Sequence, residues 1–131
     1  MAAAVSPAVT VNSTSVVSVL AGAMQTVEEL APGRTKLVIG TGYTSASTIG
    51  RAPGTLAEMR ACIQSVRELL AGKSVDFGGT PGRLGYASGR RIPVLMAASG
   101  PKAIEVAGEV ADGVLLLVGS NRGIVETALG H

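Results

Sequence analysis

Two runs of small residues are the parts of this chain whose types and spacing could bind a ligand: Ala97, Ala98, Ser99 and Gly100, and Gly40, Thr41 and Gly42. Each run follows an apolar stretch without alternation, a pattern typical of a parallel strand covered on both faces. Pro101 follows the first run and suits the first position of a helix, where a missing N–H costs nothing. Because anions bind where parallel strands end beside helix N-termini, the sequence predicts an anion-binding rim.

The elements that must position these runs are strands alternating with helices. Strands are expected near residues 37–40, 92–97 and 114–118, and helices from residue 13 or 14 to 30, at 55–70 and from Pro101 until Asp112 and Gly113 end it. This alternation predicts a parallel α/β protein. Since βαβ units are right-handed almost without exception, the loops after the strands should open on one rim, where the last strand closes at Gly119 and Ser120.

Two connecting segments are predicted to be irregular. Residues 43–54 should form a long polar loop of the kind that faces a substrate, with Arg51 either meeting an anion or lying solvated at the surface. Residues 73–91 are rich in glycine, with a short strand at 75–77. Between them, Thr55 and Glu58 have the spacing of a capping box that begins a helix.

Both ends of the chain give weaker patterns. Residues 1–12 could be a strand or the lead into a helix. After Gly119 the chain allows one short helix, with Ile124, Val125 and Leu129 expected to face inward. Cys62 is interpreted as core packing because no acid or base lies at a recognisable position for a nucleophile.

Composition restricts the function further. The 131 residues are 47% hydrophobic and 15% charged, which predicts a single domain over residues 1–131. Aromatic residues make up 2% of the chain and the net charge is +2 without a long basic run, so nucleic acid is not expected as a partner. No apolar run reaches the ~20 residues of a membrane helix, and residues 16–24 lack the basic flank of a signal peptide. One cysteine favours a reducing compartment, with the cytoplasm as the default, and a lone histidine at position 131 makes a metal site unexpected.

Glycine motifs leave alternatives open. Gly40, Thr41 and Gly42 are either a tight turn that needs positive φ or a cofactor contact. A dinucleotide fingerprint would need glycine where Ser45 stands, and a P-loop would need it where Arg67 stands. A small doubly wound sheet fits 131 residues, whereas a complete eightfold barrel usually needs ~250.

The residues point more narrowly than the pattern does. The stretches LAPGRTKLVIGTGYTSASTIGRAPGTLAEMR and RRIPVLMAASGPKAIEVAGEVADGVLLLVG closely resemble the bacterial luciferase-like monooxygenase superfamily, and within it the coenzyme F420-dependent methylenetetrahydromethanopterin reductase group. The resemblance runs from about Pro7 to Gly119. It implies a (β/α)8 TIM barrel with a flavin or the deazaflavin F420 across its carboxyl rim, where hydride is accepted or delivered.

Carried over by position, the family's cofactor contacts fall on nine residues: Gly40, Thr41, Gly42, Ala97, Ala98, Ser99, Gly100, Gly119 and Ser120. The chain resembles a middle slice of the barrel, from after the third strand to after the sixth. The early strands that carry most of the family's acid and base residues are absent, and Ser6 stands where the family often has histidine. No catalytic residue is therefore assigned.

Two functions follow from the resemblance. The first is an F420- or FMN-dependent oxidoreductase, or a piece of one, acting on a small-molecule substrate. The alternative is an inactive half-barrel that assembles as a homo-oligomer or with a complementary barrel fragment, because open strand edges invite pairing. The predicted fold is accordingly a partial (β/α)8 barrel, with the doubly wound sheet as its alternative.

Overall fold

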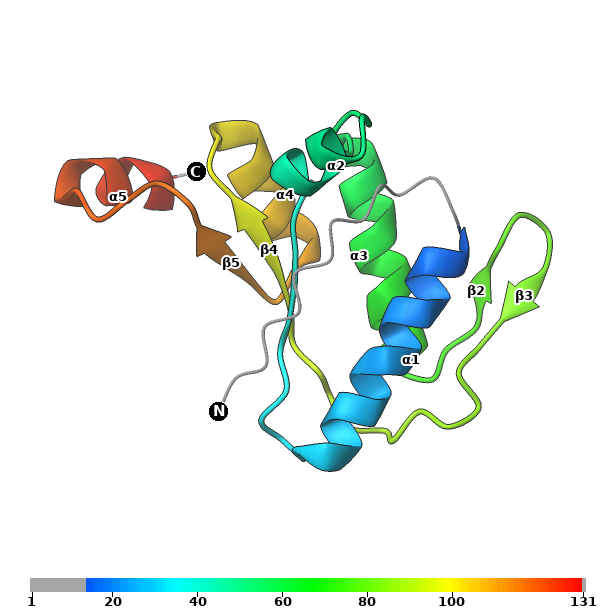
Figure 1. Ribbon diagram of the computed structural model, residues 1–131. Coiled ribbons are helices and arrows are strands. Elements are labelled where there is room, and N and C mark those ends of the chain that lie inside the picture. Colours follow the sequence, from blue (N-terminus) through cyan, green and yellow to red (C-terminus); the bar gives the residue numbers. More distant parts are fainter. Residues whose placement is uncertain (1–13, 131) are drawn as a thin grey trace.

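The computed structural model describes residues 14–130. Its main sheet has three parallel strands in the order β1 (Leu37–Ile39), β4 (Val94–Ala98) and β5 (Gly113–Leu116). Figure 1 draws β4 and β5 as arrows, and β1 lies in the unlabelled cyan segment beside β4. This order runs in one direction along the chain, as in successive barrel units, whereas a doubly wound sheet reverses its order at a switch point. A second, antiparallel sheet consists of β2 (Val75–Asp76) and β3 (Pro81–Gly82).

Five helices accompany these strands: α1 (Thr14–Leu30), α2 (Tyr43–Thr48), α3 (Leu56–Leu70), α4 (Pro101–Val110) and α5 (Arg122–Leu129). Three of them confirm the sequence prediction closely, namely α1, α3 and α4. The capping box of α3 is present, because Thr55 Oγ1 accepts from the Glu58 N–H while the Glu58 carboxylate accepts from the Thr55 N–H. This reciprocal pair fixes the first turn of α3.

The hydrophobic core lies on one face of the main sheet. Leu37, Ile39, Val94 and Met96 are fully buried against apolar residues of α1, α3 and α4. Residues that alternate with them, such as Val38, Leu95 and Ala97, are only half-buried. The expectation that these strands are covered on both faces is therefore wrong, because the other face is not packed against any of the described helices.

The last strand shows the same correction more strongly. Leu115 is 47% exposed and Leu117 is 60% exposed, although this stretch was expected to be buried. In α5 the inward-facing residue is Ala128, whereas Ile124 and Leu129 are exposed. A helix begins there because the Asn121 side chain accepts from the Ile124 N–H at 3.3 Å. The sequence thus predicted the helix but not which side of it is buried.

Two connecting segments contain structure that the sequence did not predict. Residues 43–48 form the short helix α2 in place of a loop, since Gly42 adopts φ 70° and its carbonyl accepts from the Ala46 N–H at 2.7 Å. Beyond the expected strand at Val75–Asp76, the chain turns back into β3. The Asp76 carboxylate accepts from the Gly79 N–H at 2.7 Å, which closes this turn.

Some predictions fall outside residues 14–130, namely the strand or helix lead at 1–12 and the role of position 131. Within the described residues, no helix combines the length and apolarity required to cross a membrane. The described part of the chain also contains no group of three or more His, Cys, Asp or Glu side chains that could hold a metal ion.

Candidate functional site at the carboxyl ends of the strands

The predicted small-residue runs lie together at one rim of the sheet. Ile39 pairs with Met96 and Ala98 pairs with Leu116 in parallel register, so the chain leaves all three strands at the same edge, which points upward in Figure 1. A methyl group added to Gly40 would lie 3.5 Å from the Ala97 side chain, which places the first two runs side by side. The Leu117 N–H donates to the Ala98 carbonyl at 2.8 Å, which holds the segment leading to Gly119 and Ser120 at the same rim.

The turn between β4 and α4 leaves the start of α4 accessible. Gly100 is the N-cap residue, with extended backbone and no side chain capping the helix. Pro101 takes the first helical position, as predicted, and the N–H groups of Ala103 and Ile104 both donate to the Gly100 carbonyl. A Cβ on Gly100 would meet no atom within 4 Å, and Ser99 is exposed. An anion could therefore approach the positive end of this helix.

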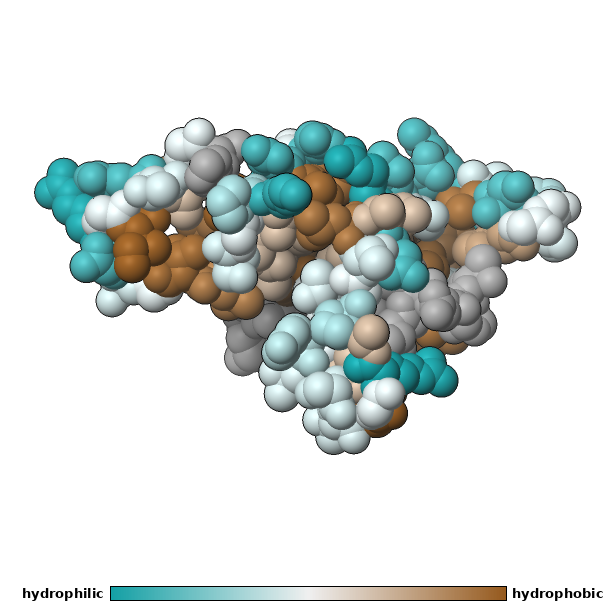
Figure 2. Space-filling view, turned by 90° about the horizontal axis from the view of Figure 1, so that it is seen from above, coloured by the Kyte–Doolittle hydropathy of each residue, from teal (hydrophilic) through white to brown (hydrophobic). Residues whose placement is uncertain are grey.

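A groove of about 360 Å³ opens beside this turn, between α4 and α5. Its polar lining includes Ser99, Asn121 and Thr127, and its apolar lining includes Ile104, Val118 and Ile124. Figure 2 looks down on the rim from above the view of Figure 1 and shows apolar residues gathered at the end of the molecule that carries β5 and α5. A mostly apolar groove with a few polar groups at one end has the composition of a small-molecule site.

The turn after β1 serves conformation at least in part. Gly42 has φ 70° and Gly119 has φ 75°, a region that favours glycine. The expected positive φ is thus confirmed at Gly42, where it begins the helix α2 rather than a tight turn. Gly40 has no positive φ. The Thr41 carbonyl accepts from the Gly54 N–H at 3.0 Å, which folds residues 49–54 back onto the strand end. Contact of these residues, and of Ser120, with a cofactor stays a prediction.

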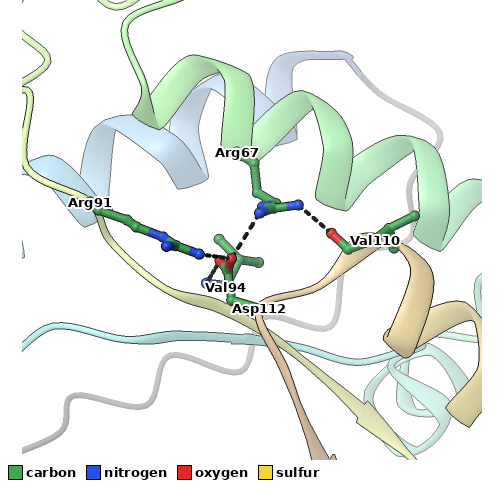
Figure 3. Close-up of polar contacts among 5 residues, drawn as sticks. All are labelled: Arg67, Arg91, Val94, Val110 and Asp112. Carbon is green, nitrogen blue, oxygen red and sulfur yellow. Dashed lines mark hydrogen bonds and ion pairs between the residues drawn. The ribbon is translucent and has the colours of Figure 1, made fainter.

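The opposite end of the sheet contains an ion-pair cluster that sequence reasoning missed (Figure 3). Asp112 Oδ1 accepts from Arg67 at 2.8 Å and from Arg91 at 2.5 Å, while Oδ2 accepts from the Val94 N–H at 2.9 Å. Arg67 also donates to the Val110 carbonyl at 2.8 Å. Burial raises the pKa of Asp112, but the Val94 N–H and the charges of Arg91 and Arg67 lower it by more, so this pKa lies below its ordinary value.

Two further buried groups have structural roles. Glu28 accepts from the Gly33 N–H at 2.7 Å; this bond lowers the pKa of Glu28 below its ordinary value although burial opposes the change. Burial raises the pKa of the Cys62 thiol to about 11. Because the thiol stays protonated and lies in the core, the interpretation of Cys62 as packing is confirmed.

The chain is similar in sequence to known proteins over most of its length. A family model described as luciferase-like monooxygenase matches residues 4–130. The chain is 35% identical over 103 residues to a 5,10-methylenetetrahydromethanopterin reductase of Archaeoglobus fulgidus, covering 73% of this chain and 31% of the relative. It is 33% identical over 124 residues to an F420-dependent glucose-6-phosphate dehydrogenase of Mycolicibacterium fortuitum, covering 86% of this chain and 37% of the relative.

A solved structure extends the likeness to the fold. The coenzyme F420-dependent tetrahydromethanopterin reductase of Methanopyrus kandleri superposes with a TM-score of 0.71 at 22% identity, over 95% of this chain and 42% of that chain. The predicted fold, parallel βα units forming part of a TIM barrel, is thereby confirmed over its doubly wound alternative. The chain spans about a third of the length of the curated relatives that it matches.

Proposed function

We propose that this chain, which belongs to the luciferase-like monooxygenase family, binds coenzyme F420 at the carboxyl ends of its parallel strands as part of an F420-dependent oxidoreductase. The observation that carries the proposal is the turn at residues 97–100. Its small residues end a central strand, leave α4 without a side-chain cap and border the groove. Relatives named for F420 dependence support this cofactor over FMN.

The residues present fit a phosphate-bearing cofactor. The Ser99 hydroxyl and the first turn of α4 would hold the phosphate, because N–H groups at a helix start favour negative charge. Gly40, Thr41 and Gly42 on one side and Gly119 and Ser120 on the other would line the rest of the rim. When bound, such a cofactor supplies hydride transfer, and the chain supplies orientation and electrostatics.

We also propose a class of substrate and a cellular location for the protein. The second substrate would be a small organic molecule, which the relatives' names support as a class. A single buried cysteine is consistent with a cytoplasmic location. No catalytic acid or base is assigned, since none of the described residues that line the groove has a titratable side chain.

A fluorescence titration of the purified chain with F420, and in parallel with FMN, tests the proposal. We expect a saturable change with F420, because the strand ends and α4 are formed in the chain as it stands. Saturation with FMN alone would identify FMN, and not F420, as the cofactor. No saturation with either would overturn the proposal of cofactor binding. A fluorescent dye without a phosphate serves as the control for nonspecific binding to the apolar groove.

The exposed edge strand favours a second candidate function. Leu115 lies exposed on β5 and Leu117 lies exposed directly after it, and β5 is an edge of the described sheet. A half-barrel of this kind would cover these leucines by assembling with a second copy or with a complementary barrel fragment. Sedimentation over a range of concentrations should then show self-association of the chain, or association only on addition of a complementary fragment. A monomer in both cases contradicts this candidate.

A further inference from the structure

A second pocket of about 340 Å³ lies at the amino end of β4, away from the rim. Three arginines line it, Arg67 from α3 and Arg90 and Arg91 from the segment before β4, together with Leu70 and Ile92. We propose that this arginine pocket binds a small dianion of the phosphate or phosphate-monoester class. The inference is independent of cofactor binding, because none of these residues belongs to the rim.

The arginine pocket carries more positive than negative charge on the side of Arg67 and Arg91. Arg67 and Arg91 both donate to the same oxygen of Asp112, so two cations share one carboxylate (Figure 3). Arg90 also lines a neighbouring pocket with Glu28 and Glu29. Two guanidinium groups, those of Arg67 and Arg91, therefore face one carboxylate, and the repulsion between them would be reduced by a further anion.

The arginine pocket also offers unused hydrogen-bond donors. A guanidinium has five N–H groups in a planar fork that matches phosphate oxygens. Arg91 uses one nitrogen for Asp112, and its side chain is 77% exposed. The Arg90 side chain makes no hydrogen bond within the described part of the chain. Both groups can thus turn toward a ligand in the pocket without giving up the contacts that hold Asp112.

The carboxyl end of α3 lies against the arginine pocket. Unpaired carbonyls at a helix C-terminus would repel an anion. All four of the last carbonyls are paired here: Arg67 with the Ala71 N–H, Glu68 with the Lys73 N–H, Leu69 with the Gly72 N–H and Leu70 with the Gln25 amide. The arginines, rather than open carbonyls, therefore set the potential of the pocket. Its volume lies at the lower end of the range for small-ligand sites.

Amide NMR of the full chain, titrated with inorganic phosphate near neutral pH at constant ionic strength, tests this inference. We expect saturable shifts at Gly89, Arg90 and Arg91, which lie in the pocket wall. Arg90→Gln should weaken phosphate binding at least tenfold while leaving the Asp112 contacts intact, and Arg91→Gln should weaken it similarly. The matched control is Arg83→Gln, which removes an exposed arginine outside the pocket.

Two results would overturn the inference. One is a linear, unsaturated response of the wild-type amides, which would indicate only general screening of charge. The other is an equal loss of affinity in Arg83→Gln and Arg90→Gln, which would show that net charge and not the pocket attracts phosphate. Either result leaves the F420 titration unaffected, so the two proposals fail separately.

Discussion

At the amino end of β4, the Asp112 carboxylate is held by two arginines and the Val94 N–H. At the carboxyl end of the same strand, by contrast, Gly100 begins α4 without a side-chain cap. The first arrangement joins α3, β4 and the start of β5. The second leaves the start of α4 beside an open groove. In barrels of this type, contacts at the amino end of the strands stabilise and residues at the carboxyl end bind ligand.

This contrast teaches that the two ends should respond differently to substitution. A change at the amino end should alter the free energy of unfolding and leave cofactor affinity as it is. A change at the rim should do the reverse, because the small residues there support few contacts. Urea unfolding and F420 titration can both be applied to each variant, so the two effects can be compared directly.

The largest effect is expected for Asp112→Asn. The substitution removes the charge that both arginines contact, and one of its amide N–H groups must face a donor, so unfolding should become easier by about 2–3 kcal/mol. Urea unfolding measures this loss. F420 affinity should stay unchanged in the same variant. A large loss of F420 affinity with an unaltered urea midpoint would reverse the roles of the two ends.

Acid should remove the same stabilisation in the wild type. The pKa of Asp112 is lowered on folding, so its contribution is complete above the ordinary carboxyl pKa of about 4 and is lost as pH falls through the folded value. The difference in stability between wild type and Asp112→Asn should therefore stay constant from about pH 7 to about pH 4 and narrow as pH falls below about 4. Glu28 has a lowered pKa in both proteins, so its contribution cancels. A constant difference would exclude Asp112 as the titrating group.

At the rim, Gly100→Ala should lower F420 affinity at least about tenfold, or about 1.4 kcal/mol, without changing the urea midpoint. The backbone of Gly100 is extended and a Cβ there meets no atom, so folding should tolerate the methyl group. The methyl group would occupy the space through which a phosphate approaches the helix. Gly108→Ala is the matched control, since it adds an equally uncrowded methyl group farther along α4. Equal F420 affinity in the two variants would show that the turn at residues 97–100 is not part of the cofactor site.

Local rules predicted the rim better than the ion-pair cluster around Asp112. The ends of β1 and β4, the Thr55 capping box and Pro101 at the start of α4 are each decided by neighbouring residues, so the sequence predicted them to within one residue. The last strand, expected to run to residue 118, ends at Leu116. Asp112 is 45 residues from Arg67 and 21 from Arg91, and nothing in the local pattern distinguishes it from any acid that ends a helix. Its role depends on how α3 packs on α4, which no short stretch encodes.

The exposed residues of β5 and α5 were mispredicted for a related reason. Hydrophobic character predicts burial only where a partner element is present to cover the side chain. Leu115, Leu117 and Ile124 have that character, but no described element packs over them. The short helix α2 was missed because its amino end depends on the positive φ of Gly42, a property that the sequence interpretation assigned to a turn.

The smallest effect is expected for Glu109→Gln, which breaks the ion pair between Arg60 of α3 and Glu109 of α4. This pair connects the same helices as Arg67 and Asp112 do, and the arginine side chain is 40% exposed in both, but Glu109 is 53% exposed where Asp112 is 9% exposed. Because solvent screens an exposed pair, its loss should change the unfolding free energy by less than about 1 kcal/mol. Comparing the urea unfolding of Glu109→Gln with that of Asp112→Asn therefore shows whether the burial of the carboxylate, and not its charge alone, determines the stabilisation. Equal losses would mean that the contact between α3 and α4, and not the buried carboxylate, stabilises the amino end.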